Sequence, residues 1–226
     1  MKTSSDLLTI LQHGDSFFPS GAVSFSWGIE TLNSDNKLVR AGDVEKFVSH
    51  QLSDRWASSD RVVLCAAFEF GGDLANVLCA DNAMDSNSLP REQREGSCKM
   101  GSAFLNIHSK LGTQNASSYQ MLVRSGKAPG HIAAVQGLIW SELNIDRNSA
   151  CNMSAHAYVL GMLGAALRLN LIGHIDCQKI LGKMHNVIRT LLSLPVPELC
   201  GLNSYSPAVD IAIMRHETQK KRLFSN

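Results

Sequence analysis

Apolar residues recur at helical spacing along most of this chain. In residues 43–57, 99–112 and 180–192 they return every three or four positions, the stripe of a helix with one buried face. Residues 153–173 are apolar nearly all round, which predicts a helix at the centre of the fold. The hydrophobic pattern therefore favours an all-α protein.

The sequence also marks where these helices begin and end. Asp43 is a typical cap or first-turn acid, Gly112 closes the second stripe, and Pro195 stops the last one. Residue types that favour loops gather in three places. We expect loops at 81–90, 125–131 and 195–207.

Strand signals are poor, because no N-G or D-G turn lies between two alternating runs. No linker is long enough to divide the chain, and no internal repeat is present. We predict a single all-α domain over residues 1–226, a bundle of about eight to ten helices.

Composition places the chain among ordinary globular proteins. Apolar residues make up 44% and charged residues 18% of its 226 residues. The net charge of +1 provides no basic face, so we expect neither nucleic acid nor a membrane as a partner. The six cysteines form no C-x-x-C pair, and no signal peptide is recognisable. A cytoplasmic protein with reduced thiols is expected.

Residues 13–30 concentrate aromatic side chains around a proline and a glycine. Phe17 and Phe18 are neighbours, so on an extended segment they point to opposite sides and one of them is expected at the surface. Exposed aromatics such as these, with Phe25 and Trp27, indicate a contact surface. A turn whose aromatics fill the core explains the same pattern, and both interpretations stay open.

Residues 206–226 are predicted to form a terminal helix with basic residues in its last turns, where they complement the helix dipole. Leu223 and Phe224 lie at the chain end and need a surface that covers them. We expect a tail docked at a subunit interface, with Arg222 offering its guanidinium to a carboxylate.

Signatures of catalysis are missing from the sequence. It contains no phosphate-binding loop, no dinucleotide-binding motif and no nucleophile elbow. The eight histidines form no i, i+4 pair, and Lys220 stands where a zinc motif starting at His216 needs a second histidine. We predict no catalytic residues, no metal ligands and no tightly bound cofactor. His216 with Glu217 is either a pair at a contact surface or a core-edge histidine beside a solvated acid.

Five ordered segments carry a resemblance. Residues 15–32 follow D-S-x-x-P-x-G, then an aromatic and serine segment, then G-[LI]-E, and residues 206–226 follow D-I-x-x-M-x-H-E-x-x-x-x-R-L-F. Residues 91–105, 129–138 and 168–181 match an M-G helix, a G-H segment and an R-L…G-x-x-D-x-Q helix pair. In this order the segments resemble the UreF family of urease accessory proteins.

The resemblance implies an all-α cytoplasmic protein that does no chemistry itself. Members of the family dimerise, bind UreD (also called UreH) and together recruit the GTPase UreG. The assembly inserts nickel into apo-urease, so the resemblance implies a chaperone whose complex handles nickel without holding it as a tight cofactor. It also implies modulation of GTP hydrolysis by UreG. Val23 stands where the family has an aromatic implicated in recruiting UreG.

These expectations combine into one predicted partner-binding site built from both ends of the chain. Its residues are Phe17, Phe18, Val23, Phe25, Trp27, His216, Glu217, Arg222, Leu223 and Phe224. Two alternatives remain: a helical scaffold or divergent paralogue unrelated to urease, and a helical metalloenzyme with histidine and cysteine ligands.

Overall fold

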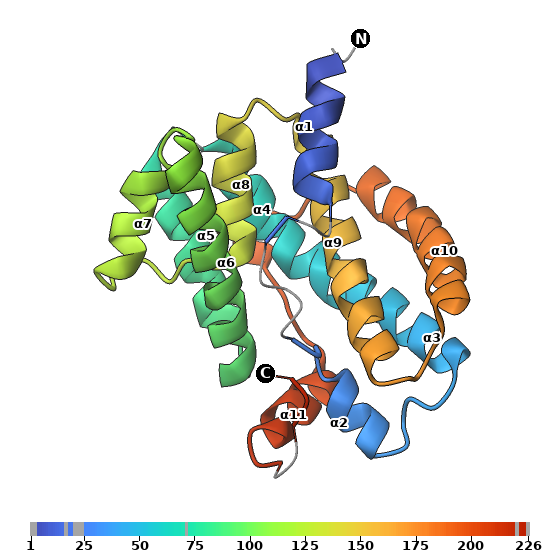
Figure 1. Ribbon diagram of the computed structural model, residues 1–226. Helices are drawn as coiled ribbons and strands as arrows, with labels where there is room; N and C mark the ends of the chain where they lie inside the picture. The colour runs from blue at the N-terminus through green and yellow to red at the C-terminus, as the bar shows by residue number, and fades with distance from the viewer. Residues whose placement is uncertain (1–3, 16–17, 20–24, 71, 220–221, 225–226) are drawn as a thin grey trace.

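The structure, a computed structural model, describes residues 4–15, 18–19, 25–70, 72–219 and 222–224. None of these residues lies in a strand, so the all-α prediction is confirmed (Figure 1). The helices are α1 (Ser4–Gly14), α2 (Ile29–Ser34), α3 (Ala41–Gln51), η2 (Leu52–Asp60), α4 (Arg61–Glu69), α5 (Leu74–Asn87), α6 (Arg91–Leu111), α7 (Ala116–Arg124), α8 (Ile132–Glu142), α9 (Arg147–Arg168), α10 (His174–Ser193), η3 (Leu199–Gly201) and α11 (Pro207–His216).

Helix α9 is the centre of the fold, as its all-round apolar sequence predicts. It contacts α1, α2, α3, α4, α8 and α10. Its buried residues lie on several of its faces and include Val159, Met162 and Ala166. A helix that buries residues in several directions must be surrounded by other elements. Figure 1 shows it among α1, α3, α4 and α10.

Helices α3, η2 and α4 follow one another without a break. Asp43 stabilises the first turn of α3, as predicted. Its side-chain Oδ2 accepts a hydrogen bond from the Arg40 backbone amide at 3.0 Å. The η2 segment is a π-helix that joins the α-helices α3 and α4. It places Trp56 in the core, where the indole nitrogen donates to Ser154 Oγ at 3.1 Å.

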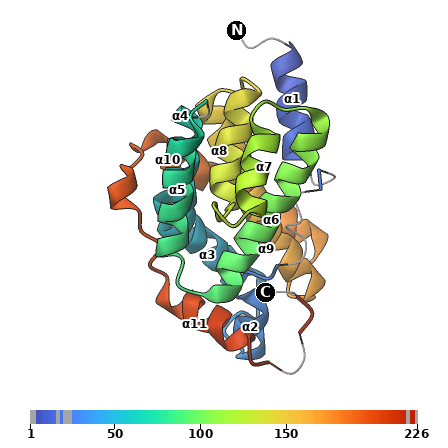
Figure 2. The same cartoon turned by 90° about the vertical axis from the view of Figure 1, so that its left-hand side faces the viewer.

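Helices α5 to α8 lie on one side of the molecule, where α5 and α8 pack on α4, α6 packs on α8, and α7 packs on α6 (Figures 1 and 2). Helices α4 and α8 approach closely because Gly137 has no side chain. A Cβ atom there would lie 2.4 Å from the Leu64 carbonyl oxygen. Gly101 plays the same part on α6, where a Cβ would lie 2.0 Å from the Gly130 carbonyl oxygen. These two glycines hold α6 and α8 against their neighbours.

Two of the predicted boundaries are wrong. Residues 81–87 are helical, because α5 begins at an Asp73 cap and its polar last turn bonds back to its own carbonyls, as Ser86 Oγ does to Asn82 O. The terminal helix ends at His216, so Arg222 lies beyond it and does not complement its dipole. The loops at 125–131 and 195–207 are confirmed, apart from the short turn η3.

The C-terminal end of the chain returns to α2. Helix α11 packs on α2 and on the start of α6, and the last described residues bond to α2 (Figure 1). Gly28 and Glu30 of the N-terminal motif therefore lie beside the C-terminal motif. None of the helices in the described part of the chain is long and apolar enough to cross a membrane.

Candidate functional site

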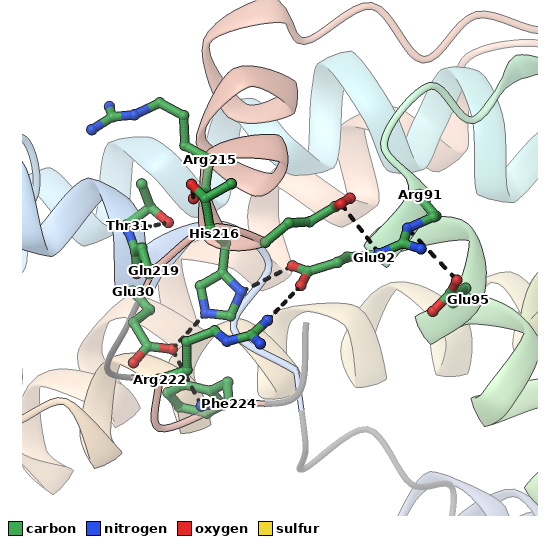
Figure 3. A network of polar contacts seen from close by, with 12 residues as sticks. Glu30, Thr31, Arg91, Glu92, Glu95, Arg215, His216, Gln219, Arg222 and Phe224 are labelled. Atoms are coloured by element: carbon green, nitrogen blue, oxygen red, sulfur yellow. Dashed lines mark hydrogen bonds and ion pairs between the residues drawn. The ribbon is translucent and has the colours of Figure 1, made fainter.

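The place where the tail meets α2 and α6 holds a network of charged groups, which we call the tail junction. It consists of Glu30 on α2, Glu92 on α6, His216 at the end of α11, and the tail residues Arg222, Leu223 and Phe224 (Figure 3). Its members are as much as 194 residues apart in the sequence.

His216 lies between the two carboxylates (Figure 3). Its Nδ1 is 2.9 Å from Glu92 Oε2 and its Nε2 is 3.0 Å from Glu30 Oε2, and the ring is fully buried. Each ring nitrogen thus faces one carboxylate oxygen. Hydrogen bonds of this kind offset part of the cost of burying the two carboxyl groups.

The tail completes the pairing of both carboxylates. Arg222 Nη1 donates to Glu92 Oε1 at 3.0 Å. The backbone amides of Leu223 and Phe224 donate to Glu30 at 2.7 and 3.2 Å. The Phe224 ring is buried beneath the guanidinium of Arg168, whose Cζ lies 4.4 Å from the ring centroid. The carboxylate predicted to receive Arg222 therefore belongs to the same chain.

A ring of exposed ion pairs surrounds the junction. Arg91 bridges Glu217 at 3.3 Å and Glu95 at 3.8 Å (Figure 3). Arg215 pairs with Asp35, and its hydrogen bond lowers the pKa of that carboxyl. Because water surrounds these ion pairs, each contributes little to the stability of the fold. The junction therefore depends chiefly on its buried residues.

A second buried pair anchors α11 to the π-helix. Arg55 Nη1 lies 3.4 Å from Asp210 Oδ1, and both side chains are almost fully buried. Burial raises the pKa of Asp210, while the Arg55 guanidinium opposes that shift. The pair fixes Asp210 of the C-terminal motif against η2. Because His216 lies on the same helix, nearly two turns after Asp210, the pair also helps to position His216.

The aromatics of the N-terminal segment are largely core residues where the structure describes them. Phe25 is buried against Gly96, and Phe18 is half-buried with its ring 5.2 Å from that of Phe104. Trp27 packs edge-on to Tyr158 at 5.3 Å. The core interpretation therefore accounts for these three residues. Phe17 and Val23 of the predicted site lie outside the described residues.

The structure also sorts the predicted residues of the tail. His216 and Phe224 are buried in their own chain, so they serve the junction and cannot be touched while the tail is docked. Leu223 is 63% exposed, and the side chains of Arg222 and Glu217 are 41% and 27% exposed. Of the predicted tail residues, these three are accessible, and their contact with a partner stays a prediction.

Sequence reasoning missed the central part played by Glu30 and Glu92. Glu30 belongs to the matched N-terminal motif, but nothing near it in the sequence shows that it receives the tail. Glu92 is one charge among several at the start of α6, and only its 8% exposure sets it apart. Of the two interpretations of His216 with Glu217, the structure agrees with the core-edge histidine, because His216 turns inward to these two residues.

Metal-ligating residues do not gather elsewhere in the part of the chain that the structure describes. No group of three histidine, cysteine or acidic side chains is placed to hold a metal ion there. The closest histidines come in pairs, His13 with His108 and His156 with His185, whose ring centroids are 5.2 and 5.7 Å apart.

The UreF family model matches residues 38–185. This chain belongs to the UreF family. The protein named urease accessory protein UreF from Trichodesmium erythraeum is 30% identical, over 98% of this chain and 97% of the relative. Its namesake from Paenarthrobacter aurescens is 32% identical, over 96% of each. That from Yersinia pseudotuberculosis is 26% identical, over 98% and 99%. The similarity to members of the UreF family thus extends over nearly the whole chain.

Proposed function

We propose that this chain is a non-enzymatic adaptor in urease maturation, which binds UreD/UreH, recruits the GTPase UreG and supports nickel insertion into apo-urease. The observation that carries the proposal is the nearly full-length similarity to proteins named urease accessory protein UreF. Glu30 of the N-terminal motif and His216 of the C-terminal motif contact each other in the tail junction, which supports a shared role for the two motifs. Its place of action on this proposal is the cytoplasm.

The proposed docking face is the exposed side of α11 together with the exposed part of the tail. Leu223 is exposed at the tail, and Ile211 and Met214 are exposed one helix turn apart on α11. Exposed apolar side chains next to charged ones are typical of protein interfaces. Arg222 and Glu217 supply the charged rim. The same apolar surface is available for the predicted homodimer.

Co-purification tests this docking face. Ile211→Asp and Leu223→Asp place a charge on it without touching the core, so we expect recovery of UreG from a UreD-containing complex to fall at least tenfold, about 1.4 kcal/mol. Leu111→Asp is the matched control, because Leu111 is 60% exposed at the end of α6. Equal UreG recovery from all three variants would contradict the proposed face.

Two activity measurements test the adaptor role itself. GTP turnover by UreG is measured with and without this chain, and the chain alone is expected to turn over no GTP. Urease activation is measured in cells that lack their own UreF. Failure to restore urease activity would favour the paralogue unrelated to urease, and a stoichiometric tightly bound metal in the purified chain would favour the metalloenzyme.

A further inference from the structure

Two buried cysteines from different helices face each other. Cys65 on α4 and Cys151 on α9 are 86 residues apart in the sequence, and their Sγ atoms are 3.5 Å apart. Both are free thiols with only 3% of their surface exposed. Helices α4 and α9 are in contact here. A disulfide bond of about 2.05 Å needs the two sulfurs to approach by only about 1.5 Å.

One of the two thiols borders a cleft. Cys65 lines a cleft of about 540 Å³ between α4, α5, the start of α9 and the loop after α10. Cys79, Glu69 and Arg147 also line it, and Pro195 and Leu199 form its far wall. The cleft is large enough for a small molecule to reach Cys65.

The surroundings give the two thiols different roles. A hydrogen bond from Cys151 lowers the pKa of Cys65, and the guanidinium groups of Arg147 and Arg61 act in the same direction against burial and Glu69. The same hydrogen bond and burial raise the pKa of Cys151. Of the two cysteines only Cys65 is among the residues that line the cleft, so we assign Cys65 as the sulfur that a reagent entering the cleft meets first.

We propose that Cys65 and Cys151 form a peroxide-reactive dithiol, in which a peroxide entering the cleft converts the pair into a disulfide between α4 and α9. The Cys65 thiolate attacks one oxygen of hydrogen peroxide. The O–O bond breaks, a sulfenic acid forms, and the departing hydroxide takes a proton to become water. The Cys151 sulfur then attacks the Cys65 sulfur, and the sulfenic oxygen leaves as a second water with the Cys151 proton. Two thiols lose two electrons to the peroxide, and two waters form.

The inference is independent of the proposed role in urease maturation, so its failure leaves that role untouched. The reduced full-length chain is titrated with hydrogen peroxide, and the remaining thiols are labelled with a maleimide and counted by mass. We expect two of the six thiols to be lost first. Peptide mapping is expected to find the Cys65–Cys151 link, and the oxidised chain is expected to melt at a higher temperature.

Three variants make the assignment specific. Cys65 and Cys79 share one tryptic peptide, so Cys79→Ser both resolves the map and acts as the matched control from the same cleft. It is expected to lose the same two thiols. In Cys151→Ser the reaction should stop at the sulfenic acid of Cys65, which dimedone traps. In Cys65→Ser the Cys151 thiol should stay reduced while the wild-type pair is oxidised.

Two results would overturn the proposal. One is oxidation of the exposed Cys79 and Cys200 before any loss of Cys65. The other is a disulfide that joins any other pair in the wild-type chain. Circular dichroism of each variant verifies the fold, and fragment sequencing of the disulfide-linked peptide from the wild-type chain decides the matter even where a variant does not fold.

Discussion

The tail junction and the α5–α8 half both bury carboxylates, and they pair them in opposite ways. In the α5–α8 half, Asp81 accepts from three neutral donors, the Tyr119 hydroxyl at 2.7 Å and the amides of Gly130 and His131 at 2.7 and 2.8 Å. In the tail junction, Glu30 and Glu92 receive a histidine between them, and Glu92 also receives the Arg222 guanidinium.

The difference lies in where the donors come from. All three donors to Asp81 are within 50 residues of it and lie at or beside packed helices. Several donors to the junction belong to the last described residues, which lie outside any helix. The Asp81 site is therefore a fixed part of the core, whereas we expect the tail to open at a lower free-energy cost.

The largest expected effect is that of Asp81→Ala. It leaves three buried donors without an acceptor, at about 1–3 kcal/mol each, so we expect the free energy of unfolding to fall by roughly 4 kcal/mol. Urea denaturation measures this. Asp81→Asn is the control, since it keeps one acceptor oxygen and should lose less. If Asp81→Ala unfolds at the wild-type urea midpoint, the Asp81 site is not a fixed part of the core.

His216→Ala is next. It removes the ring that bonds both buried carboxyl groups, and losing a buried partner costs about 1–3 kcal/mol for each group left without one, so we expect a loss of roughly 3 kcal/mol. The same denaturation experiment applies, with His174→Ala as the control because that histidine is exposed at the start of α10. A His216→Ala chain as stable as the His174→Ala chain would show that the junction does not need its central histidine.

A third prediction uses the pH dependence of the α5–α8 half. Burial lowers the pKa of His108 to about 4, and the nearby His13 acts in the same direction. The unfolded chain then binds a proton more readily than the folded one. Stability should be full above pH 6.5 and fall by about 2 kcal/mol as the pH drops from 6.5 toward 4.

Melts of wild type and His108→Gln at pH 7 and pH 5 measure this. The variant should lose less stability between the two values than the wild type, because it lacks one buried histidine that resists protonation. The same pH loss in both proteins would exclude His108 as its source.

The smallest effect on stability is expected for Arg222→Ala, at about 1 kcal/mol, because its side chain is 41% exposed. Its effect on the tail should be larger. We expect faster cleavage of the tail by carboxypeptidase and weaker recovery of UreG. Arg215→Ala is the matched control, since that arginine pairs with an exposed acid at the same end of the molecule. Equal tail cleavage in both variants would show that Arg222 does not hold the tail.

The helical stripes, their caps and the family follow from the sequence alone. Periodicity at 43–57 and 180–192, the Asp43 start and the Gly112 stop reflect local rules, which depend on residues three or four apart. The prediction of a loop at 81–90 was wrong in its first part. Asp81 is a poor helix former, but hydrogen bonds from Tyr119 and Gly130 stabilise it within α5, and the local sequence does not reveal these distant donors.

Only the tertiary structure decided what the terminal motifs do. Whether Phe25 faces a partner or the core, and which carboxylate receives Arg222, depends on residues far away along the chain, Gly96 and Glu92. The same holds for Cys65 and Cys151, which the sequence shows only as two scattered cysteines. Such pairs form only when helices pack together. Packing brings side chains into contact that are far apart in the sequence, and nothing in the sequence around either residue indicates its partner.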